Sequence, residues 1–179
     1  MYGEKVHQAS SRTSALGITT ALLSLVLLAG CAKTAPPAST AQAGIGESIT
    51  LSSPPLTMRA KLVRVLNPVA GGPQDNPGTG SHYVGIVISL TNTSHATYSD
   101  MPIDFASLWT NNNEQAQGAV IIGGPCADAT SGFAETDIVI PPGKTAQGCI
   151  PFTVTNGLQL ARFTFYLEYE PHTAQWVLN

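Results

Sequence analysis

The stretch 163-FTFYLEYE-170 alternates large apolar side chains with side chains that suit a wet surface. Successive side chains of a β-strand point to opposite faces, so this alternation predicts a strand that is buried on one face only. Residues 56–62 (LTMRAKL) and 83–91 (YVGIVISLT) repeat the pattern. We therefore expect a fold in which the apolar faces of several strands pack together.

Shorter apolar runs predict further strands, and turn residues separate them. The runs lie at residues 105–109, 119–122, 137–140, 147–155 and 176–178. The turn stretches are the Gly/Pro-rich loop 67–81, Asn111–Asn113 and Pro141–Gly143. No long stretch after residue 31 has a helical period. Short strands between Gly, Pro and Asn turns are typical of an all-β sandwich or barrel.

Three short motifs add a resemblance to this pattern. They are Asn92 at the end of an alternating strand, 140-IPPGKT-145 and 148-GCIPFTV-154. Together they resemble a family of Gram-positive exported proteins with a domain of unknown function, similar to a secreted mycobacterial immunogenic antigen. The resemblance covers most of residues 56–178 and implies an immunoglobulin-like antiparallel β-sandwich. It implies no catalytic residues, and the cysteine pair of this chain is not part of the family pattern.

The amino-terminal stretch has the parts of an export signal. A basic head and an apolar run over residues 15–28 precede small residues and Cys31. The run is shorter than the roughly 20 apolar residues that a spanning helix needs. The stretch 28-LAGC-31 resembles the lipobox of bacterial lipoproteins, which implies a diacylglyceryl group on the Cys31 sulfur and a mature chain that begins there. The alternative is an uncleaved signal anchor with an incidental cysteine.

The sequence thus predicts three segments. Residues 1–30 form a lipoprotein signal peptide, 31–46 a flexible Pro/Ala/Thr linker, and 47–179 the β-sandwich domain. The linker composition offers too little apolar surface to order itself. We expect the protein at the cell membrane, anchored by lipid at Cys31 and facing the extracytoplasmic side.

Composition limits the possible partners. Without the signal peptide, six Lys and Arg face ten Asp and Glu, and no basic stretch suggests nucleic acid. Two cysteines then remain besides Cys31, namely Cys126 and Cys149. In an exported protein such a pair predicts a disulfide, with two buried free thiols as the alternative.

Motifs for phosphate binding and hydrolysis are incomplete. Residues 143–145 (GKT) end like a P-loop, but Ile138 stands where the first glycine belongs, so we predict a turn. Residues 46–48 (GES) begin like a nucleophile elbow, but Thr50 replaces its second glycine. The mature histidines stand singly beside turn-like stretches: His82, His95 and His172.

Candidate ligand side chains have simpler interpretations. Four acidic residues could offer oxygen atoms to Ca²⁺, but they lack the spacing of a known loop, so solvated loops are favoured. These residues are Asp100, Asp104, Glu135 and Asp137. The sequon Asn92-Thr93-Ser94 is interpreted as a turn, and Trp109 and Trp176 as core anchors. We predict no metal, cofactor or catalytic residue.

The leading hypothesis is a lipid-anchored, non-enzymatic binding or interaction module of the bacterial cell envelope. Its partners would be the membrane, through Cys31, and an exported protein or envelope ligand. One alternative is a structural or envelope-assembly lipoprotein that binds another exported protein. The other is a hydrolase with an unrecognised site, which requires one of the three histidines beside a hydroxyl or carboxylate in a cleft.

Overall fold

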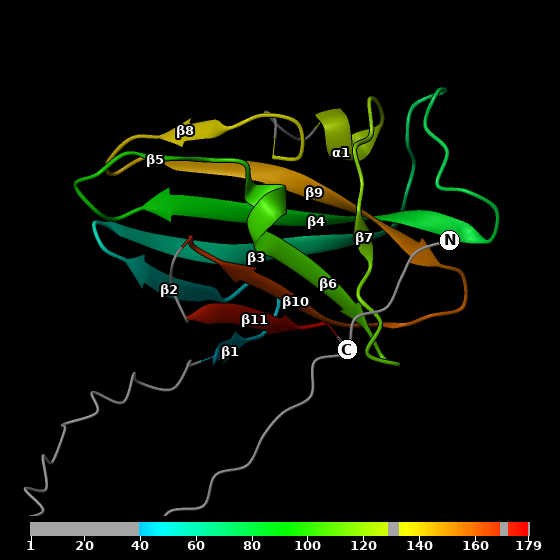
Figure 1. Cartoon of the computed structure of the whole chain (residues 1–179), viewed down its shortest axis with the longest axis horizontal. Coiled ribbons are helices and arrows are strands. Elements are labelled where there is room, and N and C mark those ends of the chain that lie inside the picture. Colours follow the sequence, from blue (N-terminus) through cyan, green and yellow to red (C-terminus); the bar gives the residue numbers. More distant parts are fainter. Residues whose placement is uncertain (1–39, 129–132, 169–171, 179) are drawn as a thin grey trace, which may run out of the picture. The chain divides into compact units, whose positions relative to one another are not determined.

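A computed structural model describes residues 40–128, 133–168 and 172–178, all of which belong to the unit Pro36–Asn179. Cys31 and the predicted signal peptide lie outside the described residues. Two β-sheets pack face to face (Figure 1). The structure therefore confirms the predicted all-β sandwich. None of the helices in these ranges is both long and apolar enough to cross a membrane.

The two large sheets contain four and five strands. In order across the first sheet, the strands are β1 (Thr40–Ala43), β11 (Thr173–Val177), β10 (Leu160–Tyr166) and β6 (Ala106–Thr110). In order across the second, they are β2 (Ser48–Ser53), β3 (Leu56–Val69), β4 (Ser81–Asn92), β9 (Thr145–Thr155) and β7 (Gln117–Gly118). A small third sheet pairs β5 (Tyr98–Asp100) with β8 (Ile138–Ile140). Two short helices, η1 (Pro102–Phe105) and α1 (Pro125–Asp128), lie in the connections.

The main core lies between the two large sheets. Phe163 and Phe165 of β10 are fully buried there, as their alternation predicts, and the Phe163 ring packs 5.7 Å from the Trp176 ring. The second sheet contributes alternate residues of β4, from Val84 to Leu90. Strand β4 is also buried on its other face, because the segment that follows β7 covers it. That second burial positions the candidate site.

The predicted linker end at Gly46 is wrong. Residues 40–43 form β1, which pairs in parallel with β11, from Thr40 opposite Thr173 to Ala43 opposite Trp176. Most side chains of β1 are exposed, so its order comes from backbone hydrogen bonds to an edge strand. Such bonds need no apolar side chain and leave no sequence pattern. The ordered domain therefore includes Thr40.

Other strand predictions need smaller corrections. Residues 119–122 form no strand, because β7 ends at Gly118 and only the Ala119 N–H still bonds the neighbouring β9, at Pro151. Strand β3 continues to Val69, into the predicted loop. Strands β2 and β5 were not predicted, although the buried Ile49, Leu51 and Ser53 of β2 alternate with exposed residues.

The motifs that carried the family resemblance meet in space. The Lys144 N–H donates to the Pro141 oxygen at 3.1 Å, and Gly143 has a φ of 73°, which describes a type II turn. The Gly143 N–H donates to the backbone carbonyl oxygen of Asn92 at 2.8 Å, and the backbone N–H of Asn92 donates to the carbonyl oxygen of Lys144 at 2.9 Å. Asn92 is fully buried, so the sequon is a structural turn. These motifs are structural, and they tie the end of β4 to the start of β9.

Candidate functional site

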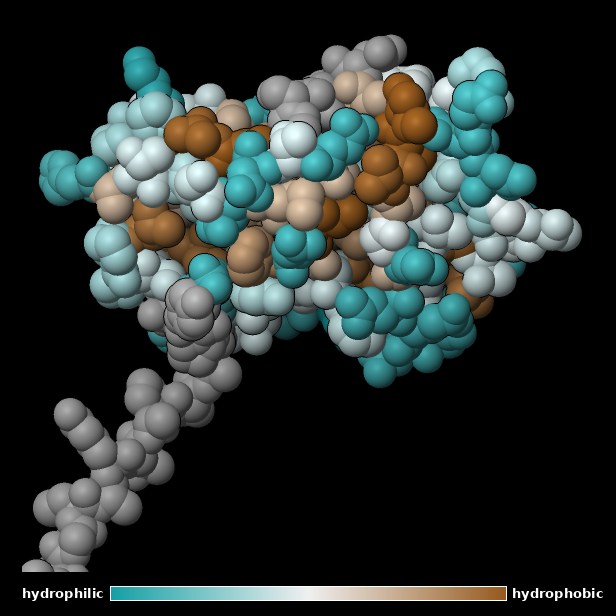
Figure 2. Space-filling model, turned by 45° about the horizontal axis from the view of Figure 1, so that its top comes forward, coloured by the Kyte–Doolittle hydropathy of each residue, from teal (hydrophilic) through white to brown (hydrophobic). Residues whose placement is uncertain are grey.

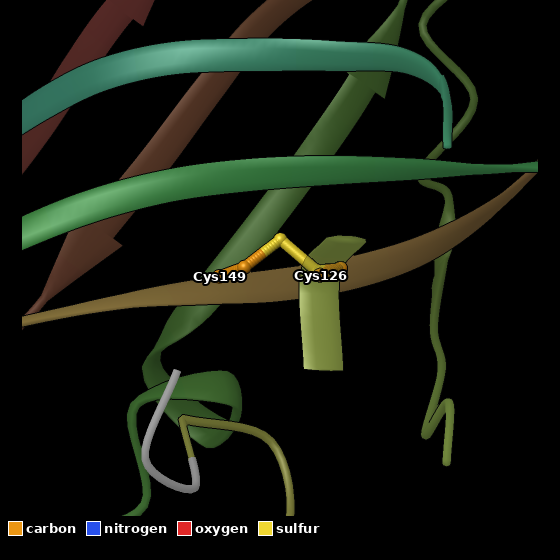
Figure 3. Close-up of a disulfide and its surroundings, with 2 residues drawn as sticks. All are labelled: Cys126 and Cys149. Atoms are coloured by element: carbon orange, nitrogen blue, oxygen red, sulfur yellow. A yellow bond between two sulfur atoms is a disulfide. The ribbon is translucent and has the colours of Figure 1, made fainter. Parts of the chain in front are cut away.

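A disulfide holds the connection after β7 against the five-stranded sheet. Cys126 in α1 and Cys149 in β9 are joined, with 5.3 Å between their Cα atoms (Figure 3). The pair agrees with the sequence prediction, and only 2% of each residue is exposed. The bond fixes α1 over the outer face of β9, the face away from the main core.

Gly85 of β4 makes room for this disulfide. A Cβ atom at residue 85 would lie 2.7 Å from the Cys149 sulfur, which is too close, and 3.2 Å from the Cys126 sulfur, which is a tight contact. This role of Gly85 was not predicted from the sequence. The available signal was a single glycine inside an apolar strand, which often marks a close approach of another chain segment.

A second apolar cluster surrounds the disulfide. Its buried members are Val69, Tyr83, Val87, Ile121, Cys126 and Cys149. Ile121 points into this cluster, whereas its neighbours Val120 and Ile122 are 57% and 79% exposed. Figure 2 shows hydrophobic side chains that reach the surface on this side of the molecule. We call residues 119–124 the display segment.

Asp75, in the loop between β3 and β4, binds the display segment. Its carboxylate accepts hydrogen bonds from the N–H groups of Gly72 (2.6 Å), Ile122 (2.9 Å) and Gly123 (3.3 Å). These bonds, with that of Ile122 the largest contribution, hold the pKa of Asp75 below its ordinary value. Gly72 and Gly123 also touch through their backbones, since a Cβ on Gly123 would lie 2.9 Å from the Gly72 Cα. The display segment is therefore held by the disulfide and by a carboxylate.

Replacing Asp75 with Asn should loosen the display segment. Because folding lowers the pKa of Asp75, its contribution is present above the unfolded-state pKa and is lost as pH falls through the folded-state pKa. In the unmodified chain we expect the protection of the Ile122 and Gly123 amides, measured by hydrogen exchange, to fall as Asp75 becomes protonated. In Asp75→Asn this pH-dependent step should vanish. An unchanged step in the variant would show that another group holds the segment.

The predicted acidic residues come partly together near β5 and β8. Asp100 pairs in register with Ile138, next to Asp137. Burial raises the pKa of Asp100, and the carboxylates of Glu168, Asp137 and Asp104 raise it further. Over residues 40–128, 133–168 and 172–178, no group of three or more His, Cys, Asp or Glu side chains could hold a metal ion. The carboxylates of Asp100, Asp104, Asp137 and Glu168 therefore repel one another, and we call this group the acidic edge.

Tyr98 lies beside this acidic edge. Its residue is 1% exposed, and its hydroxyl is the buried side-chain polar atom that lacks a hydrogen-bond partner in the described part of the chain. Burial raises the pKa of Tyr98, and Asp100 and Asp137 add to the rise. The phenol therefore stays protonated.

The histidines and tryptophans occupy separate places. The two ring nitrogens of His82 lie 2.8 Å from the side-chain oxygen of Asn156 and 2.9 Å from that of Asn67. Its partners are thus amides, whereas the hydrolase hypothesis requires a hydroxyl or a carboxylate. Trp176 is buried, and its Nε1 donates to the Glu47 oxygen at 3.1 Å, as a core anchor should. The prediction for Trp109 is wrong, because it lies on the outward side of β6 under the Arg162 guanidinium, 4.6 Å from its ring centroid.

A polar cavity opens where β6 and β9 end. It holds about 300 Å³, and its lining includes Ser81, Thr110, Glu114, Gln117 and Thr153. None of its lining residues is a histidine. The cavity brings one carboxylate beside hydroxyls and amides, without a nucleophile–base pair of the kind that the hydrolase hypothesis requires.

By these features the protein belongs to the class of β-sandwich domains, and a disulfide fixes the connection after β7 to the outer face of one sheet. Neither the family models nor the curated proteins contain a match. Among solved structures the domain is similar to the secreted protein MPT63 of Mycobacterium tuberculosis, with a TM-score of 0.54 and 16% identity over 79% of this chain and 99% of that one. This likeness confirms the resemblance to the mycobacterial secreted protein at the level of the fold.

Two Bacillus subtilis proteins have similar folds. The candidate lipoprotein YcdA gives a TM-score of 0.57 and 10% identity over 76% of this chain, which spans 39% of the length of YcdA. The protein YjhA gives a TM-score of 0.55 and 9% identity over 76% of this chain and 98% of that one. At such identities the likeness establishes a shared fold.

Proposed function

We propose that the chain is a lipid-anchored, extracytoplasmic, non-enzymatic binding module of the bacterial cell envelope. The display segment carries this proposal, because it exposes Val120 and Ile122 on a backbone fixed by Cys126 and Asp75. Exposed aliphatic side chains are suited to contact with another protein. A backbone that is ordered before binding loses less conformational entropy when the partner arrives.

The envelope location draws support from independent features. The stretch 28-LAGC-31 would supply the lipid, and the fold is similar to those of a secreted protein and a candidate lipoprotein. The Cys126–Cys149 bond also suits an oxidising compartment, because cytosolic reductants keep most thiols reduced. The proposed partner of the display segment is another exported protein.

Replacing Cys31 with Ala tests the anchor. The variant should leave the membrane fraction or accumulate as an unprocessed precursor, because one thiol carries both acyl chains. Fractionation and intact mass measure the outcome. A Cys31→Ala chain that is processed normally and stays with the membrane would refute the anchor.

The display segment is tested separately. A photo-crosslinking side chain at Ile122 should trap an exported protein in intact cells, and Val120→Asp should reduce that adduct. Val139 on β8, which is 63% exposed, provides the matched control for both changes. A crosslinker at Val139 should give no such adduct. The substitution Val139→Asp should leave the Ile122 adduct intact. Equal adducts from Ile122 and Val139 would mean that the display segment is not a binding surface.

A further inference from the structure

Basic side chains of the domain are concentrated on one strand. The described residues include five Lys or Arg, and three of them, Arg59, Lys61 and Arg64, lie on β3. All three are exposed, and no strand of the five-stranded sheet contains Asp or Glu. We call this row the basic face. It is a local excess of positive charge on an acidic protein.

The basic face lies on the outer side of the sheet. Arg59 and Lys61 alternate with three residues whose side chains are fully buried in the main core, namely Met58, Ala60 and Leu62. A register shift between Leu62 and Arg64 brings Arg64 to the same outer side, opposite Val87. Hydroxyl groups flank it on both sides, since Arg59 pairs with Thr50 and Thr91, and Lys61 pairs with Ser48 and Ser89. These neighbours are short and uncharged, so they leave the cations accessible.

No internal partner neutralises the basic face. Within the described ranges, none of its three side chains makes an ion pair or a hydrogen bond. Arg162 differs, because its guanidinium donates to the Asn113 side-chain oxygen at 2.8 Å and covers the Trp109 ring. The three cations of β3 are therefore available to an external anion.

The start of the ordered domain places this face near the anchor. Strand β1 begins at Thr40 on the outer edge of one sheet, and it contacts β2, the outer edge of the other sheet. Strand β3 is the next strand after β2. From Cys31 to Thr40 the chain has nine residue steps, which reach about 30 Å at most when fully extended. A lipid on Cys31 would therefore keep Thr40, and with it the β1–β2 edge, within about 30 Å of the bilayer.

We propose that the basic face rests on anionic phospholipid headgroups of the membrane that holds the anchor. This inference rests on the lipid anchor of the proposed function. Attraction between the cations and the headgroups acts within a Debye length of about 8 Å, which the short tether allows. The tether also raises the local concentration of headgroups, so weak attraction is sufficient.

The rest of the molecule agrees with this orientation. The acidic edge at β5 and β8 lies on the opposite side of the sandwich from β1 and β2 (Figure 1), where repulsion from anionic lipid is smallest. The display segment follows β7, the strand farthest from β2 in its sheet. The display segment packs near Val87 and Cys149 on the same outer face of this sheet, so it stays open to an exported protein when the β2 side of the sheet tilts toward the membrane.

The test uses the chain from Cys31 to Asn179, coupled through the Cys31 thiol to a maleimide lipid in vesicles. Cys126 and Cys149 are joined to each other, so Cys31 is the thiol that reacts. Lysine acetylation rates are measured by peptide mass spectrometry on phosphatidylcholine vesicles with and without phosphatidylglycerol. We expect the rate at Lys61, relative to that at Lys144, to fall about fivefold with phosphatidylglycerol and to recover at high salt.

Charge variants make the test specific. For the variants, protection is the ratio of the Lys61 acetylation rates on vesicles without and with phosphatidylglycerol. Arg59→Gln should lower this ratio, whereas Lys144→Gln, which removes the same charge from the turn before β9, should leave it unchanged. Equal effects of the two variants, or protection that requires an anionic cell-wall polymer instead of phosphatidylglycerol, would overturn the proposal. Because the lipid is attached chemically, a failure here is distinct from a failure of the Cys31→Ala experiment.

Discussion

Replacing Asn92 with Ala should lower the free energy of unfolding by roughly 3 kcal/mol. The Asn92 amide nitrogen donates to the carbonyl oxygens of Ala96 (2.7 Å) and Ile140 (2.8 Å). Its side-chain oxygen accepts from the Ser94 N–H (3.0 Å) and the Ser94 hydroxyl (2.7 Å). One buried side chain therefore joins the end of β4, the following turn and β8.

The expected effect is large because the partners stay behind. A hydrogen bond contributes a net stability of about 1 kcal/mol, but a buried group that is left without its partner lowers the stability by about 1–3 kcal/mol. The Ile140 carbonyl is such a group, since Ile140 is 1% exposed. Chemical denaturation should show a lower midpoint with an unchanged slope.

Asn111 provides the matched control for this substitution. It is also an asparagine at the end of a strand, but its residue is exposed. Asn111→Ala should change the free energy of unfolding by less than about 0.5 kcal/mol. If Asn92→Ala were equally harmless, the buried amide would not organise this end of the sandwich.

Reduction of the Cys126–Cys149 disulfide should destabilise the domain by about 3 kcal/mol. The two cysteines are 23 residues apart, and the bond removes the entropy that this loop would have in the unfolded chain. For a domain of this size, the melting temperature should fall by about 10 °C. Thermal unfolding with and without reductant measures the change.

The same bond should control the display segment. Without it, α1 is no longer fixed to β9, and hydrogen exchange at residues 119–126 should accelerate more than exchange in the centre of β4. The double variant Cys126→Ala and Cys149→Ala should melt at the lower temperature whether or not reductant is present. A melting temperature that reductant leaves unchanged, with both thiols verified as free, would contradict the stabilising role of the bond.

Local alternation allowed the sequence to predict the sandwich. Phe163 and Phe165 point into the core because every second residue of a strand faces the same side, and that period is visible in one stretch of chain. The turn at Gly143 was predictable for a similar reason, since Pro and Gly favour a specific backbone geometry. The cysteine pair followed from its count in an exported chain.

The tertiary structure alone decided which distant segments touch. Strand β1 forms by backbone bonding to β11, more than a hundred residues away, with mostly exposed side chains. The display segment is held by Asp75 and by the disulfide that lies above Gly85. The position of β1 at the sheet edge brings the basic face near the predicted anchor. A periodic pattern reports which face of a strand is buried, but backbone pairing and the approach of a remote loop depend on the packing of the whole chain. For this reason the sequence by itself determined the class of fold and the disulfide pair, and the packing determined where the exposed surfaces lie. The anchor at Cys31 stays a prediction from the sequence.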